Sequence, residues 1–580
     1  MVIIGINAFH GDSSACLIVD GKLIAAAEEE RFIRIKHWAG FPSESIKYCL
    51  KVAGLKLSDV NFIAINQNPV SNLTRKFLYT ITHFPSYKLI LDRLKNRKKR
   101  ISIENKLRID FPNDFFQGKV EYVDHHLAHL ASAHYVSPFT NSVVVSVDGF
   151  GDFASTAWGL GQGNNLNVDE RIYFPHSLGI FYMAITQFLG FTTWGDEYKV
   201  MGLAPYGKPR YLDEMRNIIK LSNDGKFKLN LKYFLHHRER TEVEWNGAEP
   251  KVGNLFSSEL EKLLGPQRKK GEELTTYHYD LARSAQAMYE EAFFHLLNYL
   301  HTHYSKDNLT LAGGCAMNSV ANGKIYQNTP FKQVYIQAAA GDAGGAIGAA
   351  NVVLFRNKEA SRFQMNNAYW GPQYSDLDIE VLLNQEVIRI KQAGCEIRLI
   401  QDDDNLTGEV AKAIADGLVV GWFYGRMEWG PRALGNRSIL GDPRRSDMKD
   451  ILNIKIKRRE SFRPFAPSIL RENVKEWFEV DDDVPFMMQV YQIREEKRSF
   501  IPAVTHVDGS GRLQTVTTVT NSRYYKLISK FKEITGVPIV LNTSFNENEP
   551  IVCNPKEALD CFLRTKMDVL VMQNWILRRS

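Results

Sequence analysis

Cysteines are few in this sequence and show no pairing pattern. The six of them are scattered along 580 residues without a C-x-x-C pair, the spacing that typically binds zinc or exchanges disulfides. This absence argues against a disulfide scaffold and against a thiolate-bound metal. It also predicts a reducing compartment, which we take to be the cytoplasm.

Long apolar runs are missing as well. No stretch approaches the roughly 18 apolar residues that are needed to span a bilayer. The short apolar run that follows Met1 has no positively charged region before it. We therefore expect neither a membrane span nor a signal peptide.

Charge of one sign is only weakly in excess. Lys and Arg total 72 against 66 for Asp and Glu, a net charge of +6, which is no signature of nucleic-acid binding in a chain of this length. With 44% hydrophobic and 24% charged residues, the composition is that of an ordinary globular protein. The length predicts about three to five domains, and phosphorylated small molecules remain candidate partners.

A strand–turn–strand pattern is present twice, about 140 residues apart. Val2–Ile6 and Ala15–Val19 are apolar strands on either side of a polar turn, while Ser142–Val147 and Ala154–Leu160 flank the turn Asp148–Asp152. The repetition predicts two like-folded halves around one cleft. Such glycine-containing polar turns can bind phosphates, and the alternative is two ordinary β-hairpins.

Two further apolar runs end in glycine-rich strings. Leu309–Ala312 precedes GGCAMNS, and Val334–Ile336 precedes AAAGDAGGAIG. Both are typical of a strand-to-helix junction, where backbone N–H groups can bind a phosphate. Tight helix packing is the alternative for each string taken alone. Lys199 lies in a third loop, WGDEYKVMGLAPYG, which fits either a nucleotide site or a packed surface loop.

Histidine and aspartate residues form a candidate metal site. His125 and His129 are four residues apart and would share one face of a helix, while Asp148 and Asp342 lie in glycine-rich turns. This mixed nitrogen and oxygen set suits Fe(II), Mn(II) or Zn(II), although a hydrogen-bonded histidine face remains the alternative. His10, in the first turn, is either a general base or a hydrogen-bonding turn residue.

Basic residues in the C-terminal third lie inside strings bounded by Gly or Pro. These strings are Gly425–Ser438, Lys455–Ser468, His506–Arg512 and Asn542–Asn546. Guanidinium groups fixed in such turns can bind phosphate oxygens bidentately. They therefore predict a second anion site, and the polar stretch Asn366–Ser375 predicts a domain boundary before it.

With these strings in view, the sequence resembles the NodU/CmcH family of TobZ-like O-carbamoyltransferases over essentially the whole chain. The resemblance is carried by GINAFHGDSSACLIVDG, DHHLAH, VDGFGD, KVMGLAPYG, LAGGCAMNS, GDAGGAIGAA, GRMEWGPRALGNRSIL, SFRPFAPS, HVDGSGR and LNTSFN. It implies an α/β protein. Residues 1–365 would form a duplicated actin/Hsp70-like domain of the ASKHA, TsaD-like class, and residues 366–580 a YrdC-like α/β domain.

The resemblance also implies a reaction. ATP, with Mg²⁺, and carbamoyl phosphate would give carbamoyladenylate in the YrdC-like domain, and the carbamoyl group would pass to a hydroxyl of a small molecule in the N-terminal domain. The acceptor would be of the sugar, antibiotic, toxin or nucleoside type, with no nucleic-acid or membrane partner. Segments 71–110 and 236–271 are candidates for acceptor specificity. A tRNA threonylcarbamoyl-type enzyme and an actin-like sugar kinase are the alternatives.

Site residues carry over by matching motifs. The resemblance places the metal, expected to be Fe(II) with Mn or Zn as alternatives, on His125, His129, Asp148 and Asp342. It gives catalytic roles to His10, Arg463 and Lys457. The residues implied to bind the nucleotide or carbamoyladenylate in the N-terminal domain are Asp12, Gly149, Lys199, Gly313, Gly314, Asn318 and Gly341. Those implied to bind carbamoyl phosphate and ATP in the C-terminal domain are Arg426, Arg432, Lys457, Arg463, His506, Arg512, Asn542 and Ser544.

Overall fold

The computed structural model describes residues 1–83, 102–238, 243–244, 249–357, 360–457, 460 and 462–579. The chain divides into two compact units. Unit 1 comprises Met1–Asn318 and Ile325–Met365, and unit 2 comprises Ser319–Lys324 and Asn366–Ser580. The change of unit after Met365 falls at the predicted boundary, but the short segment Ser319–Lys324 groups with unit 2, which nothing in the sequence indicates.

The first sheet of unit 1, called sheet 1 here, contains the first predicted hairpin. Its strands, in the order β3-β2-β1-β4-β5, are β1 (Val2–Asn7), β2 (Ser14–Val19), β3 (Lys22–Glu28), β4 (Phe62–Ile65) and β5 (Lys119–Tyr122). Strand β1 is antiparallel to β2 and parallel to β4. Asp20 and Gly21 make the tight β2–β3 turn with φ of 49° and 84°, as an Asp-Gly hairpin requires.

The second sheet of unit 1, sheet 2, repeats this topology. Its strands, in the order β14-β13-β6-β7-β8, are β6 (Asn141–Gly151), β7 (Ala154–Gln162), β8 (Asn165–Tyr173), β13 (Asn308–Ala312) and β14 (Gln333–Ile336). Here β6 is antiparallel to β7 and parallel to β13, so β6, β7, β8, β13 and β14 correspond to β1 to β5. The two sheets of unit 1 therefore share one strand order and one pattern of strand directions.

Two helices of unit 1 pack closely with the sheets and with each other. They are α6 (His125–His134) and α14 (Gly345–Asn357). A Cβ atom on Gly348 would lie 1.8 Å from the Ala128 carbonyl oxygen, and one on Gly5 would lie 2.0 Å from that of Ala346. Only glycine permits such an approach. Tight packing is thus part of the reason for the glycines of the GDAGGAIGAA string.

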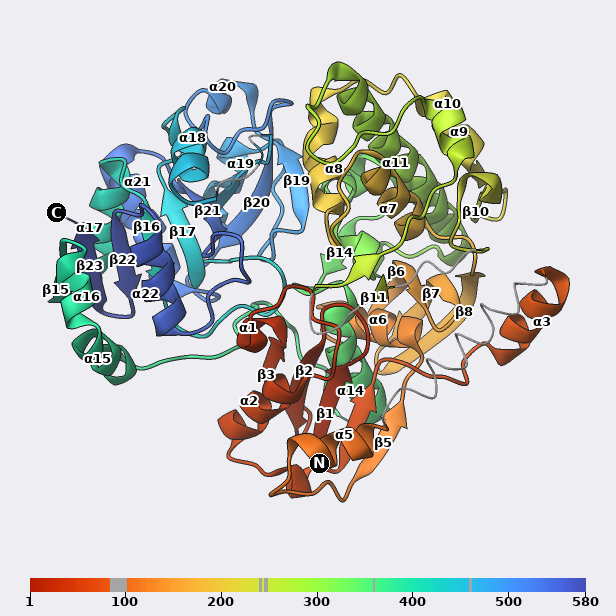
Figure 1. Cartoon of the computed structure of the whole chain (residues 1–580), viewed down its shortest axis with the longest axis horizontal. Helices are drawn as coiled ribbons and strands as arrows, with labels where there is room; N and C mark the ends of the chain where they lie inside the picture. Colours follow the sequence, from red (N-terminus) through yellow and green to blue (C-terminus); the bar gives the residue numbers. More distant parts are fainter. Residues whose placement is uncertain are drawn as a thin grey trace. The chain divides into compact units, whose positions relative to one another are not determined.

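Among the remaining helices of unit 1, α7 to α11 lie together in one group, whereas α1, α2 and α5 lie beside sheet 1 (Figure 1). The longest of them in the described part of the chain is α11, which buries one apolar side that includes Leu281, Ala285 and Met288. Their bounds are α1 (Glu30–Ile33), α2 (Ser43–Ala53), α3 (Leu73–His83), α5 (Ile103–Asp110), α7 (Leu178–Phe188), α8 (Glu197–Leu203), α9 (Leu212–Ile218), α10 (Ser258–Leu264), α11 (Thr276–Tyr304) and α13 (Ile325–Asn328). The short strands β9 (Ile219–Leu221) and β10 (Phe227–Leu229) pair with each other, as do β11 (Val243–Glu244) and β12 (Lys251–Val252).

Unit 2 is built on one mixed sheet of nine strands in the order β15-β23-β22-β16-β17-β21-β18-β20-β19. The strands are β15 (Cys395–Leu399), β16 (Val420–Phe423), β17 (Arg437–Gly441), β18 (Ala466–Leu470), β19 (Gln489–Gln492), β20 (Ser510–Val516), β21 (Ile539–Ser544), β22 (Val569–Met572) and β23 (Trp575–Arg579). The helices are α12 (Ser319–Asn322), α15 (Asp376–Gln385), α16 (Val387–Gln392), α17 (Asp403–Ala415), α18 (Met448–Leu452), α19 (Val474–Trp477), α20 (Glu495–Arg498), α21 (Ser522–Thr535) and α22 (Pro555–Arg564). The chain as a whole has an α/β fold.

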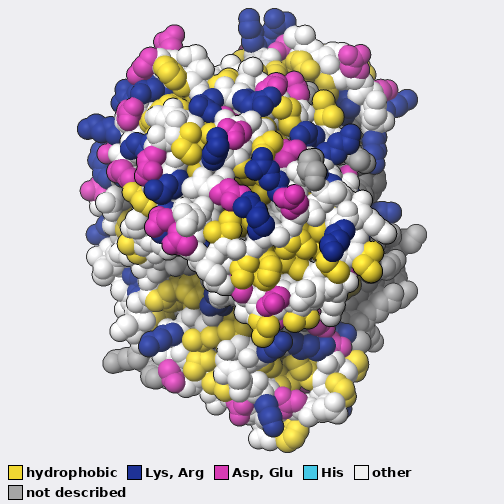
Figure 2. Space-filling model, turned by 90° about the vertical axis from the view of Figure 1, so that its left-hand side faces the viewer, with side chains coloured by type: hydrophobic (Ala, Val, Ile, Leu, Met, Phe, Trp, Pro, Cys, Tyr) yellow, Lys and Arg dark blue, Asp and Glu magenta, His cyan; other side chains and the backbone are white. Residues whose placement is uncertain are grey.

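Three features of the structure relate to the composition. All six cysteines are free thiols. Within the described ranges, no helix combines the length and apolarity that crossing a membrane requires. On the face drawn in Figure 2, Lys and Arg side chains are interspersed with Asp and Glu, so the excess of six positive charges does not form a single patch there. The basic stretch at residues 93–100 lies outside the described residues.

Candidate metal centre and anion-binding residues

The four candidate metal ligands converge in unit 1. His125 and His129 lie on α6, Asp148 near the end of β6, and Asp342 in the turn before α14. Their ligand atoms all lie within 4.8 Å of one another. The two imidazole Nε2 atoms are 3.0 Å apart, and His125 Nε2 is 3.2 Å from Asp148 Oδ2. His129 Nε2 is 3.4 Å from Asp342 Oδ1.

This geometry fits a divalent metal ion. Metal–ligand bonds of about 2.0–2.2 Å place neighbouring ligand atoms roughly 3.0–3.5 Å apart, which is close to the separations seen between these side chains. Two Nε2 atoms at 3.0 Å cannot both carry a proton toward each other. A shared cation removes that conflict, and a set of two imidazoles and two carboxylates suits Fe(II), Mn(II) or Zn(II).

The electrostatics of the four side chains also favour a cation. Burial alone would raise the pKa of Asp148, but hydrogen bonds from His125 and His129 hold it well below its ordinary value. Burial alone would likewise lower the pKa of His125, yet the hydrogen bond to Asp148 and the charge of Asp342 raise it to about 9. The two carboxylates thus favour positive charge at this buried position, which protons on the imidazoles or a bound metal ion can supply.

A neighbouring aspartate holds the ligand helix in place. Asp152 Oδ2 accepts hydrogen bonds from the backbone N–H of His125 (2.9 Å) and of Asn68 (2.8 Å). Asp124 caps α6 by accepting from the Leu127 N–H at 3.0 Å. Asp152 was not predicted as a site residue. The only signal was its place in the VDGFGD string, since its partners lie far away in the sequence.

The predicted nucleotide-binding glycines lie around Asp148. Gly314 donates its N–H to Asp148 Oδ1 at 2.8 Å, and Gly313 has φ of +87° with space for no side chain, because its Cβ would lie 2.3 Å from the Val147 carbonyl oxygen. Gly149 differs, since a Cβ there would meet no atom within 4 Å. Open space therefore lies next to Asp148.

The other predicted residues of unit 1 are less closely gathered. The His10 ring centroid is 5.3 Å from that of His125. Lys199 forms an ion pair with Asp196 at 2.9 Å. The Asn318 amide bonds to the Gln286 amide at 3.1 Å. Gly341 lies beside Met317, whose sulfur would be 3.2 Å from a Cβ on it.

Asp12 is paired with a histidine that the sequence did not point to. Its Oδ1 lies 2.8 Å from Nδ1 of His37, and the His37 N–H donates to Glu30 Oε2 at 2.8 Å. Asp12 and His37 both have left-handed backbone, with φ of 57° and 52°, which is rare outside glycine and often marks a functional turn. The pairing holds the first turn of sheet 1 against the segment after α1.

This pair predicts a pH-dependent stability. Burial opposes the charge on His37, but Asp12 raises its pKa to about 9 from 6.5. A raised histidine pKa stabilises the fold fully below about pH 6.5, and the contribution is lost as the pH rises through about 9. We expect His37→Asn to lower the urea midpoint at about pH 6 and to change it little at about pH 10. Asp12→Asn breaks the same pair and should show the same pH dependence of the urea midpoint. If either variant lowered the midpoint equally at both pH values, the charged Asp12–His37 pair would not be the source of this stability.

In unit 2, the structure brings Lys457 and Ser544 together. Lys457 is only 2% exposed, and its Nζ donates to the Ser544 carbonyl oxygen at 2.6 Å and to Asn546 Oδ1 at 2.7 Å. Ser544 Oγ donates to Asn546 Oδ1 at 2.8 Å. Lys457 and Ser544 are thus held side by side by Asn546, in a position where an ammonium and a hydroxyl could bind the same phosphate group.

The remaining predicted residues of unit 2 have mixed surroundings. Arg426 donates to the Trp370 carbonyl oxygen at 2.6 Å, and Arg463 lies 3.6 Å from Glu460. Asn542 is buried, and its amide donates to Gln514 at 2.9 Å. Arg432, which follows Pro431, and Arg512, which lies on β20, are both partly buried. His506 is buried.

One arginine of the GRMEWGPRALGNRSIL string has a structural role. Arg437 is fully buried, donates to the Tyr424 carbonyl oxygen at 2.7 Å, and lies 3.7 Å from the Phe423 ring centroid. Glu428 organises the same string, since its Oε1 accepts from the N–H groups of Leu434 (2.7 Å) and Asn436 (2.8 Å). Fixed guanidinium groups in such strings therefore do not all serve anions.

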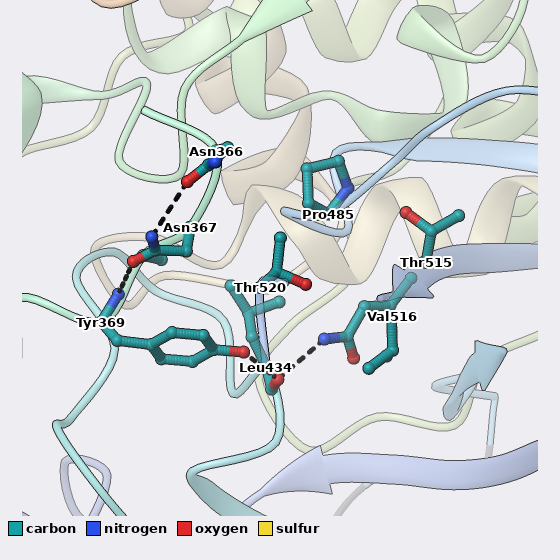
Figure 3. Close-up of a pocket in the computed structure, with 10 residues that line it drawn as sticks. Asn366, Asn367, Tyr369, Leu434, Pro485, Thr515, Val516 and Thr520 are labelled. Carbon is teal, nitrogen blue, oxygen red and sulfur yellow. Dashed lines mark hydrogen bonds between the residues drawn. The ribbon is translucent and has the colours of Figure 1, made fainter. Parts of the chain in front are cut away.

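A small pocket of unit 2 lies beside this string (Figure 3). Tyr369 Oη and Gln514 Nε2 both donate to the Leu434 carbonyl oxygen, at 2.9 and 2.8 Å. None of the predicted anion-binding residues lines it. The lining residues are Asn366, Asn367, Ala368, Tyr369, Leu434, Pro485, Gln514, Thr515, Val516 and Thr520.

The fold and the four-residue cluster define an α/β protein with a candidate metal centre, and comparison with known families gives its class. The model for the carbamoyltransferase N-terminus matches residues 2–351, and that for the carbamoyltransferase C-terminus matches residues 411–579. The chain therefore belongs to the carbamoyltransferase family and is a carbamoyltransferase enzyme. The family that the sequence motifs suggested is confirmed.

Individual relatives agree with this family. The chain is 40% identical to an uncharacterized protein of Synechocystis sp. over 100% of this chain and 97% of the relative. It is 38% identical to nodulation protein NolNO of Sinorhizobium fredii over 99% and 80%. The 3'-hydroxymethylcephem-O-carbamoyltransferase of Streptomyces clavuligerus is 33% identical over 47% of this chain and 49% of its own. Among solved structures, ROK hexokinase from Thermus thermophilus covers 61% of this chain and 100% of its own, at 13% identity and a TM-score of 0.29.

Proposed function

We propose that this enzyme is an ATP-dependent O-carbamoyltransferase that acts on a hydroxyl group of a small molecule. The observation that carries the proposal is the convergence of His125, His129, Asp148 and Asp342 in a chain of the carbamoyltransferase family. Two relatives support the choice of acceptor atom, since the names of the cephem enzymes specify O-carbamoyl transfer. The acceptor of this chain is left open.

Unit 2, for which we propose a YrdC-like fold, forms carbamoyladenylate. Carbamoyl phosphate, ATP and one water would give carbamoyladenylate, pyrophosphate and phosphate, which balances all atoms. Lys457 supports this role because its buried ammonium can bind a phosphate oxygen. Arg463 is given the same role by its motif, and its guanidinium, 3.6 Å from Glu460, has the charge and the donor groups that bind phosphate oxygens.

Unit 1, for which we propose an actin/Hsp70-like ASKHA fold, carries out the transfer. The acceptor oxygen forms a bond to the carbamoyl carbon while the bond from that carbon to the AMP phosphate oxygen breaks. His10 takes the acceptor proton, and its ring lies beside that of His125. The Gly313 and Gly314 turn lies next to Asp148 and is positioned to bind the adenylate phosphate.

His125, His129, Asp148 and Asp342 would hold a divalent metal ion, for which we propose Fe(II), with Mn(II) or Zn(II) as alternatives. When bound, such an ion acts as a Lewis acid toward phosphate and carbonyl oxygens. The site must also exclude water, because carbamoyladenylate is a mixed anhydride that hydrolyses easily. Binding must in addition fix its geometry before the carbamoyl group is transferred.

The test is a panel of hydroxylated natural products. Full-length protein is incubated with ATP, Mg²⁺, carbamoyl phosphate and each compound, and mass spectrometry searches for the addition of one carbamoyl group. We expect carbamate formation on at least one alcohol, dependent on ATP. Carbamoylation that proceeds equally well without ATP would contradict the adenylate route.

A further inference from the structure

The nine-stranded sheet of unit 2 ends in a strand that has a neighbour on one side only. Strand β15 comes first in the sheet order, and within the described residues it pairs with β23 alone. Its other side presents backbone N–H and C=O groups that can pair with a strand of another chain. The side chains of β15 decide whether such pairing is favoured or prevented.

One hydrogen bond fixes which residues face the open side of β15. The Ile400 N–H donates to the Asn574 carbonyl oxygen at 2.9 Å, and alternate residues of an antiparallel strand direct their backbone groups to opposite edges. Ile400 and every second residue before it therefore face β23. The residues between them face outward, and we call them the β15 edge: Cys395, Ile397 and Leu399. In the part of the chain that the structure describes, their outward backbone groups make no hydrogen bond.

The two residues that alternate with the β15 edge carry opposite charges. Glu396 and Arg398 are both exposed and, two positions apart on a strand, project from the same face of the sheet. Arg398 forms an ion pair with Glu409 of α17, and Glu396 lies opposite Arg578 of β23. Charged side chains on an edge strand often prevent pairing with another chain. Their arrangement therefore shows whether this edge is blocked or complementary to itself.

Two copies of β15 can meet at this edge about a twofold axis, which makes them antiparallel. An axis at Glu396 or at Arg398 would place that charge opposite its own copy, and like charges directly opposite each other are destabilising. An axis at Ile397 instead places Glu396 opposite the partner subunit's Arg398, and symmetry repeats the pair. The two side chains then form a non-hydrogen-bonded pair, the kind in which side chains are closest. In this register the edge is complementary to itself.

Apolar side chains are exposed next to the β15 edge. Leu399 is 43% exposed, and so is 71% of Ile388 on α16, a helix that packs against β15. Leu377 and Val381, one turn apart on α15, are exposed as well. Figure 1 places α15, α16 and β15 on one side of unit 2, and Figure 2 views that side, where hydrophobic side chains lie between charged ones. Removing such surface from water would add to the backbone hydrogen bonds of a strand pair.

We propose that the β15 edge binds the β15 edge of a second copy of this chain, antiparallel about a twofold axis at Ile397, so that the enzyme is a homodimer with one sheet continuous across both subunits. The pairing of Glu396 with the partner subunit's Arg398 carries the proposal. Arg398 would lie between Glu409 and the partner subunit's Glu396, and its guanidinium has enough donors for both carboxylates. The β15 edge contains none of the residues assigned to carbamoyl transfer, so the inference does not depend on the proposed function.

Two charge reversals in the full-length chain test this interface. Glu396→Arg gives a chain with two basic residues at these positions, and Arg398→Glu gives one with two acidic residues. Each variant alone places like charges opposite each other, whereas an equimolar mixture places opposite charges at both cross-strand pairs. Glu533→Arg is the matched control, because its side chain is 63% exposed and lies on α21. Sedimentation velocity over a concentration series measures the dissociation constant of the dimer.

We expect wild type and Glu533→Arg to form dimers with the same dissociation constant. Each single reversal should raise that constant about tenfold or more, because two favourable pairs become unfavourable together. The equimolar mixture should recover a dimer that contains one chain of each variant. Ile397→Pro, which removes one outward N–H without removing a bond to β23, should also weaken the dimer.

The proposal is wrong if wild type stays monomeric at the highest concentration reached, or if folded single reversals leave the dissociation constant unchanged. It is also wrong if both single reversals separate the dimer and their mixture does not restore it. Thermal unfolding identifies a misfolded variant. Should one single reversal fail to fold, the double variant with Glu396→Arg and Arg398→Glu takes its place, since opposite charges face each other again and it should dimerise as wild type does. A monomeric double variant that is folded would overturn the proposed register.

Discussion

Asp148→Ala should yield a folded enzyme that no longer retains its metal and no longer transfers the carbamoyl group. Asp148 Oδ2 lies 3.2 Å from His125 Nε2, and its carboxylate supplies half of the negative charge in the cluster. Removing outer partners of metal ligands already costs about 10- to 100-fold in affinity or activity. Removing a ligand should therefore reduce transfer at least about 100-fold.

Elemental analysis of the purified protein measures this effect directly. Asp213→Ala is the matched control, because its side chain is 90% exposed and it lies outside the cluster. Pyrophosphate formation from ATP and carbamoyl phosphate should persist in Asp148→Ala, since we assign that step to unit 2. A variant with the metal content of wild type would remove Asp148 from the ligand set.

The second large effect is that two variants should each lose a different activity: Arg463→Ala should lose pyrophosphate formation, and His10→Asn should lose carbamate formation. Arg463→Ala should lower pyrophosphate formation about 100-fold or more, as expected when one cation that stabilises developing charge is lost. His10→Asn should leave pyrophosphate formation intact and reduce carbamate formation about 10²- to 10⁴-fold, as expected for loss of a general base. The two activities are measured separately, with and without an acceptor.

This comparison is informative because each variant should keep the activity that the other variant loses, which shows that both proteins are folded. Arg471→Ala adds a further control, since this arginine pairs with Asp481 at 2.6 Å and has no assigned role. If His10→Asn abolished pyrophosphate formation while Arg463→Ala spared it, the division of labour between the units would be reversed. Equal loss of both activities in both variants would argue for one shared active site.

Much of the fold could be predicted because its signals are local. The apolar runs before and after each polar turn became β1, β2, β6 and β7, with ends shifted by up to four residues. The four-residue spacing of His125 and His129 placed both on one face of α6. Asp148, from β6, and Asp342, from the turn before α14, lie near these two histidines. Motif identity then supplied the family, which composition alone would not have done.

Contacts over long sequence distances could not be predicted. His37 meets Asp12 because the segment after β3 turns back over the first hairpin, and neither residue type nor spacing indicates that path. Asp152 and Arg437 show a second limit. Both lie in conspicuous strings, yet the Asp152 carboxylate accepts from backbone N–H groups and the Arg437 guanidinium donates to carbonyl oxygens. The sequence does not reveal these backbone partners, which give both side chains a structural role.

The most direct test of the account follows every product of one reaction. Full-length enzyme is given ATP, Mg²⁺, an acceptor identified in the panel, and carbamoyl phosphate labelled with carbon-13 in its carbonyl group. The account predicts labelled carbamate on the acceptor oxygen, with one AMP and one pyrophosphate formed for each carbamate. Formation of ADP with a phosphorylated acceptor, as a sugar kinase would give, or of a carbamate without AMP would contradict it.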